Sequence, residues 1–145
     1  MARWGLFTAM TVLGAAMSAS AMAAGATVVV NVSGVTGSSG EVRVGLYDQP
    51  SQFPKEGRHR VNGIARPVAG KATVRFENIP YGDYAVAVLY DADGDGRMKQ
   101  NALGVPQEPV GFSAGAQAGL FGPPDFAKAR FRVSAPVVTQ SVTVK

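Results

Sequence analysis

The chain has 145 residues and a formal net charge of +4, with eighteen glycines, nine prolines and no cysteine. The lack of cysteine excludes disulfide bonds, cysteine nucleophiles and metal centres held by thiolates. The positive charge is modest and spread along the chain, so it allows contact with acidic envelope polymers without indicating it, and we expect no nucleic-acid partner.

The first predicted element is a signal peptide over residues 1–23. Arg3 supplies a positive n-region, the stretch from Trp4 to Met17 is apolar, and Ala21-Met22-Ala23 offers a small-x-small cleavage site. The apolar stretch is shorter than the roughly 20 residues of a membrane-spanning helix, although a retained anchor is the alternative. We therefore expect Sec-type export to the periplasm or the medium, with no stable membrane insertion after cleavage.

The remaining residues, 24–145, are predicted to form a single domain. Apolar and polar residues alternate along five segments, and a sixth segment, Tyr84–Tyr90, is apolar on both faces like a central strand. Glycine, proline and aspartate residues separate the segments as turns. We expect an all-β fold, namely an immunoglobulin-like or prealbumin-like β-sandwich of about seven antiparallel strands. The alternating segments are Val28–Val32, Val42–Leu46, Ala72–Phe76, Ala127–Val133 and Val138–Val144.

A tyrosine at the start of the central segment has a structural role in this scheme. Tyr84 follows the turn Pro80-Tyr81-Gly82-Asp83. This placement is similar to the tyrosine corner of sandwich domains, in which the hydroxyl bonds to backbone a few residues upstream. We therefore interpret Tyr84 as a residue of the fold rather than of a site.

Three blocks of the sequence resemble a known family. The longest, Phe76–Gly96, reads Phe-Glu-Asn-Ile-Pro-Tyr-Gly-Asp-Tyr-Ala-Val-Ala-Val-Leu-Tyr-Asp-Ala-Asp-Gly-Asp-Gly, and the others are Leu103–Ser113 and Gly122–Phe131. Together they resemble domain of unknown function 2141, a group of exported bacterial proteins. The resemblance covers most of the chain after the signal peptide. It implies a prealbumin-like β-sandwich and no particular activity.

The strongest chemical signal is the run Asp91-Ala-Asp-Gly-Asp-Gly96, which directly follows the central segment. Carboxylates two residues apart on a tight turn can converge on one hard cation, as they do in calcium loops. Asp91, Asp93 and Asp95 match positions one, three and five of an EF-hand loop. Position twelve, however, is Ala102 instead of glutamate, and the flanks are not helical, so the run is not an EF-hand.

A calcium site at this run needs further ligands. Glu108 is the next carboxylate along the chain, and Arg97 could lend its backbone carbonyl. The alternative is a plain turn in which glycines supply positive φ angles and the aspartates cap loop amides. The predicted Ca²⁺ ligands are Asp91, Asp93, Asp95, Arg97 and Glu108.

A second motif suggests catalysis. Gly111-Phe-Ser113-Ala-Gly115 matches the nucleophile pattern of serine hydrolases, but that pattern needs a following helix and a histidine later in the chain. The only histidine, His59, comes earlier. We therefore interpret Ser113 as a loop serine.

Basic residues form two further groups. The cluster Lys55–Arg60 is interpreted as a solvated loop, because no aromatic residues for base stacking interleave its charges. Lys128, Arg130 and Arg132 are predicted to form a basic row on one face of a strand, where such charges keep the outer face wet.

These observations predict a non-catalytic, exported binding or accessory module of the bacterial envelope. Its expected partner is an envelope protein or a glycan, and Ca²⁺ is its one candidate cofactor. Two alternatives stay open. One is a small envelope hydrolase with loops around His59 and Ser113. The other is a carbohydrate-contacting module that uses Phe112, Phe121 and Tyr81 as exposed apolar contacts.

Overall fold

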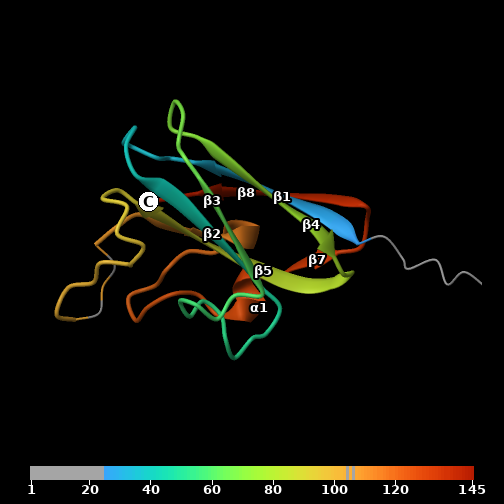
Figure 1. Cartoon of the computed structure of the whole chain (residues 1–145). Helices are drawn as coiled ribbons and strands as arrows, with labels where there is room; N and C mark the ends of the chain where they lie inside the picture. Colours follow the sequence, from blue (N-terminus) through green and yellow to red (C-terminus); the bar gives the residue numbers. More distant parts are fainter. Residues whose placement is uncertain (1–24, 104, 106) are drawn as a thin grey trace, which may run out of the picture.

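The computed structural model describes residues 25–103, 105 and 107–145, so the predicted signal peptide lies outside the described residues. These residues form eight strands in two sheets (Figure 1), which confirms the expected all-β sandwich. No helix among them is long and apolar enough to cross a membrane. The elements are β1 (Ala26–Ser33), β2 (Glu41–Tyr47), β3 (Val61–Ala65), β4 (Ala72–Ile79), β5 (Gly82–Asp91), β6 (Val110–Phe112), the 3₁₀ turn η1 (Ser113–Gly115), α1 (Phe126–Ala129), β7 (Phe131–Val133) and β8 (Val137–Thr143).

One sheet has the order β4-β1-β8, and the other has the order β3-β2-β5-β6, with β7 paired to the start of β5. The strand pairs are antiparallel except for β1 and β8, which run parallel from Thr27↔Val137 to Ser33↔Thr143. The expectation of a purely antiparallel fold is therefore wrong at this pair. After β7 the chain crosses to the other sheet, and the amide of Thr27 bonds to the carbonyl of Pro136 at 2.8 Å, so β8 enters at the end where β1 begins.

The alternating valines predicted from the sequence build the core between the sheets. In β1 the inward residues Val28, Val30 and Val32 are buried, and they face buried residues of β2 and β5 such as Val44 and Val86. Period-two alternation directs one side of each strand inward, and burying each valine contributes about 1.5–3 kcal/mol. The hydrophobic pattern alone thus sets which face of each strand is covered.

A second apolar cluster covers the outer face of β5. It explains why β5 is apolar on both sides: Ala85 is fully buried there, whereas Tyr84, Val86 and Val88 face the main core. The rings of Phe53 and Phe126 meet edge-to-face with centroids 6.0 Å apart. The cluster comprises Tyr47, Phe53, Ala85, Phe112, Phe126 and Ala129.

The predicted strand Ala127–Val133 is wrong in its first half. Phe126–Ala129 forms α1, and only Phe131–Val133 forms a strand, β7. The buried residues Phe126 and Ala129 are three apart, as on a helix, whereas Ala127 is exposed. Alanine fits either period, which is why the alternation was misleading.

The basic row predicted on that strand is also absent from the described residues. Lys128 lies on α1, while Arg130 and Arg132 follow it and both pair with Asp83, at 3.9 Å and 3.2 Å. These exposed pairs join the segment around β7 to β5, and each contributes little to stability.

The tyrosine corner is confirmed. The hydroxyl of Tyr84 donates a 2.7 Å hydrogen bond to the carbonyl of Pro80, four residues upstream. Burial raises the pKa of this hydroxyl, which keeps it protonated as a donor. Tyr84 is therefore a residue of the fold.

Candidate metal centre

The acid-rich loop begins where β5 ends, at Asp91, and its first carboxylate is completely buried. One oxygen of Asp91 accepts a hydrogen bond from the amide of Gly94 at 2.9 Å, and the other accepts one from the amide of Gly96 at 2.7 Å. Both glycines have positive φ angles, 70° and 78°, which residues other than glycine rarely adopt. The loop can therefore turn tightly around this carboxylate.

The second and third carboxylates are oriented by the same loop. Oδ1 of Asp93 accepts from the amide of Asp95 at 3.3 Å, and Oδ1 of Asp95 accepts from the amide of Arg97 at 2.8 Å. One carboxylate oxygen from each of Asp91, Asp93 and Asp95 lies within 4.8 Å of the others. The structure thus brings together the three aspartates that the sequence singled out.

Two basic side chains pair with these carboxylates, and sequence reasoning missed both. Nε of Arg43 on β2 donates to Oδ2 of Asp91 at 3.1 Å, and its Nη2 donates to Glu41 at 2.8 Å. Lys99 pairs through its ammonium with Oδ2 of Asp93. The Lys99 ammonium lowers the pKa of Asp93 to about 2, and Asp93 in turn raises the pKa of Lys99.

The sequence carried a signal for one of these partners. In the β2–β5 pairing, Glu41 lies opposite Asp91 and Arg43 lies opposite Leu89. The alternation Glu41-Val-Arg43 showed two charges on one face of a strand, but their contact with Asp91 follows only once β2 is known to pair with β5.

The two other predicted ligands lie beside this group. Glu108 is 8% exposed, and its Oε2 accepts from the amide of Lys99 at 3.3 Å, but it is not part of the set within 4.8 Å. Arg97 contributes its amide to Asp95. Glu108 therefore holds the backbone of the loop, and direct metal ligation by Glu108 and by the Arg97 carbonyl stays a prediction.

The region concentrates negative charge in a chain that is positive overall. Five of its ten acidic residues are linked here by hydrogen bonds, ion pairs or close approach, against two paired basic side chains, Arg43 and Lys99. Because Arg97 also belongs to the loop, this leaves a formal surplus of two negative charges. The five acidic residues are Glu41, Asp91, Asp93, Asp95 and Glu108.

The motif around Ser113 has a structural role. Ser113 is completely buried, and its hydroxyl accepts from the amide of Val86 at 2.8 Å and donates to the carbonyl of Ala129 at 2.5 Å. His59 is half-buried and packs edge-on against the ring of Tyr47, at 6.1 Å between centroids. This geometry gives no support to a serine nucleophile.

The aromatic residues expected to contact carbohydrate separate into two groups. Phe112 is 7% exposed and belongs to the second apolar cluster, so its predicted role as an exposed contact is wrong. Tyr81 and Phe121 are exposed. Phe112 forms part of the covering of β5 because its strand, β6, pairs directly with β5.

Comparison with known proteins finds one matching family. The family model "Uncharacterized protein conserved in bacteria (DUF2141)" matches residues 30–141. The matched range includes the acid-rich loop and the blocks that carried the resemblance in the sequence. No curated protein and no solved structure matches the chain significantly.

Proposed function

The chain belongs to this bacterial family, domain of unknown function 2141, and on that premise we propose that it is a non-catalytic binding or accessory module of the bacterial envelope. Its binding element is the loop Asp91–Lys99, and the ligand of that loop is Ca²⁺. The module acts after export, and its partner there is an envelope protein or a glycan.

One observation carries this proposal: the three carboxylates converge on a loop anchored by a buried aspartate. Calcium binds oxygen ligands at roughly 2.3–2.6 Å, so two ligand oxygens of one ion lie at most about 5 Å apart. The oxygens of Asp91, Asp93 and Asp95 lie within 4.8 Å of one another, which fits one shared ion. Solvent and loop carbonyls would complete the six to eight ligands that calcium takes.

The charge and the ligand types favour calcium over other cations. The surplus of negative charge around the loop favours a divalent cation. Zinc prefers nitrogen and sulfur ligands, and the chain has no cysteine and one histidine, His59, packed against Tyr47. Magnesium keeps several waters and is usually bound through one or two carboxylates, whereas three carboxylates converge here.

Binding would compete with Lys99. The Lys99 ammonium pairs with Oδ2 of Asp93, so an ion that binds this carboxylate must compete with the ammonium for it. This competition and the small number of carboxylate ligands lead us to expect weak binding, with a dissociation constant of about 10⁻⁴–10⁻³ M, as in extracellular modules. The ion would hold the segment between β5 and β6 in one conformation and so present a fixed surface to the partner.

The proposal predicts that calcium stabilises the protein against heat. At a calcium concentration ten times the dissociation constant, the stabilisation is about 1.4 kcal/mol, which raises Tm by a few degrees. Differential scanning calorimetry with calcium and with a chelator measures this shift. The matched variant is Asp95→Asn, which keeps an oxygen for the Arg97 amide but removes a ligand charge.

Two outcomes decide this test. We expect the calcium shift in the wild type, a smaller shift in Asp95→Asn, and no comparable shift with magnesium. Equal melting temperatures with calcium and with chelator would remove the metal from the proposed function and leave a self-capped turn.

Replacing Lys99 is expected to strengthen calcium binding. Lys99→Met removes the cation that competes for Asp93, so the dissociation constant should fall roughly three- to tenfold. Isothermal titration calorimetry of the wild type and the variant measures it. Lys71→Met is the control, because Lys71 is exposed and makes no ion pair among the described residues. An unchanged or weaker affinity in Lys99→Met would show that Lys99 and calcium do not share a site.

A further inference from the structure

The loop between η1 and α1 presents an apolar tip to solvent. Leu120 and Phe121 are 97% and 103% exposed. Beneath them Gly119 and Gly122 exchange two backbone hydrogen bonds, of 2.8 Å and 3.3 Å, and Gly122 has a φ of 130°, which favours glycine. The closed turn holds both side chains away from the protein, so the folded monomer does not bury them.

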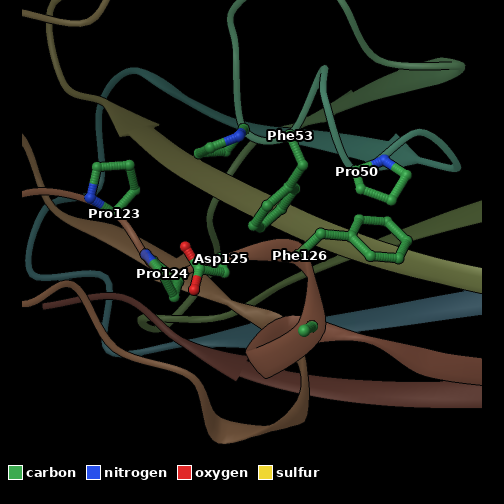
Figure 2. Close-up of a pocket in the computed structure, with 8 residues that line it drawn as sticks. Pro50, Phe53, Pro123, Pro124, Asp125 and Phe126 are labelled. Atoms are coloured by element: carbon green, nitrogen blue, oxygen red, sulfur yellow. The ribbon is translucent and has the colours of Figure 1, made fainter.

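The chain directly after the tip forms one wall of a surface hollow (Figure 2), whose lining consists of prolines, phenylalanines, Ala127 and the charged Asp125. The hollow has a volume of about 410 Å³, and the segment 50–54 forms the opposite wall. Figure 2 shows Phe53 and Phe126 close together, with Pro50 near them, and Pro123 and Pro124 beyond. A hollow of this size and lining can accept an aromatic side chain.

We propose that the tip of one copy inserts into the hollow of a second copy, so that the protein forms a dimer with two-fold symmetry. Leu120 and Phe121 precede Pro123 and Phe126 by only a few residues, so a single surface patch carries both the insert and its receptor. A two-fold axis through such a patch makes both insertions at once, because the interface is self-complementary.

Charges beside the hollow fit the same arrangement. Asp125 lines the hollow directly before α1, and Lys128 lies in the last turn of α1. Both are exposed, and neither makes an ion pair within the part of the chain that the structure describes. Across a two-fold axis, Asp125 of one copy can pair with Lys128 of the other, and the pair occurs twice. Such pairs add orientation and specificity more than affinity.

A lipid surface fits the tip less well. Residues 113–127 contain no lysine or arginine, and their one charged residue is Asp125. Anionic membranes attract proteins through clusters of lysine and arginine. The basic residues nearest this segment are Lys128 and then Arg130 and Arg132, and both arginines already pair with Asp83. A second copy, in contrast, supplies a hollow at the place where the tip needs one.

The expected dimer is weak. A buried phenylalanine removes roughly 150–250 Å² from water. Two tips and two hollows therefore bury on the order of 1,000 Å², which is at the low end for specific interfaces. We expect the dissociation constant of the dimer to lie in the micromolar range.

Sedimentation velocity of the protein expressed from the full chain tests this proposal, at concentrations up to several hundred micromolar. The wild type should show a monomer–dimer equilibrium. Phe121→Ser should be monomeric at the same concentrations. In dilute solution, where both proteins are monomers, its Tm should equal that of the wild type, since Phe121 is fully exposed. Tyr81→Ser is the matched control, because it removes an exposed aromatic ring outside the patch and should still dimerise.

Exchanging the charges of Asp125 and Lys128 gives a second test, which leaves Leu120 and Phe121 unchanged. Asp125→Lys alone and Lys128→Asp alone should each weaken the dimer by placing like charges opposite each other. Mixing the two variants should restore it as a heterodimer, because both contacts then join opposite charges. A wild type that stays monomeric, or dimers that Phe121→Ser leaves intact, would overturn the proposal. The tip would be assigned to lipid instead if the wild type stayed monomeric and sedimented together with anionic vesicles while Phe121→Ser did not.

Discussion

Replacing Ser113 with alanine is expected to lower the free energy of unfolding by about 2–4 kcal/mol. The Ser113 hydroxyl joins the amide of Val86, in the middle of β5, to the carbonyl of Ala129, at the end of α1. Alanine fits the space but leaves both backbone groups buried without a partner, and each such group costs about 1–3 kcal/mol. Urea denaturation followed by circular dichroism measures the loss.

The control for this substitution is Ser141→Ala on β8, where the side chain is exposed, and we expect a change within about 0.5 kcal/mol. A loss below 1 kcal/mol in Ser113→Ala would contradict the structural role of the hydroxyl. Labelling of the folded wild type by a serine-directed probe would do so as well, because a buried hydroxyl bonded on both sides cannot attack a reagent.

Replacing Asp91 with alanine is expected to cost about 3 kcal/mol of stability. The buried carboxylate holds the amides of Gly94 and Gly96 and pairs with Arg43, whose side chain is 28% exposed. Removing it leaves three donors without their acceptor, although solvent reaches Arg43 and reduces the cost. Chemical denaturation in the presence of a chelator measures the free energy of unfolding of the calcium-free protein.

Asp91→Asn separates geometry from charge. Asparagine has the same shape and keeps one carbonyl acceptor, but its NH2 group faces a donor, either the amide of Gly94 or the amide of Gly96 and Arg43. Its cost therefore reports the loss of the charge and of one acceptor at nearly constant shape. A cycle of Asp91→Asn with Arg43→Met should show coupling, because the two residues contact each other. Equal stabilities of Asp91→Ala and the wild type would mean that the buried aspartate does not organise the loop.

The sheets were predictable from the sequence because one physical rule produces them. Alternating apolar residues such as Val28, Val30 and Val32 must face a core, and they do so in the structure. The direction of the last strand was not predictable in this way, because alternation looks the same in parallel and antiparallel strands. Ala127–Ala129, the first part of the predicted strand Ala127–Val133, lies in α1 instead, because small alanines satisfy both periods.

In the candidate site, contacts between residues close in the sequence were predictable, whereas contacts between distant segments were not. The convergence of Asp91, Asp93 and Asp95 follows from their spacing on one tight turn, so the sequence contained it. Arg43 reaches the site only through the pairing of β2 with β5, which spacing does not reveal. Glu108 is the next carboxylate along the chain, and its contact with the amide of Lys99 could not be predicted from that position; its role as a metal ligand stays a prediction.

The most direct test of the calcium site is a crystal structure of the protein grown at millimolar calcium. We expect density for one ion at about 2.3–2.6 Å from oxygens of Asp91, Asp93 and Asp95, with the Lys99 ammonium moved off Asp93. An electron-density map with no ion between the three aspartates, and with Lys99 still paired to Asp93, would contradict the proposed function of the loop.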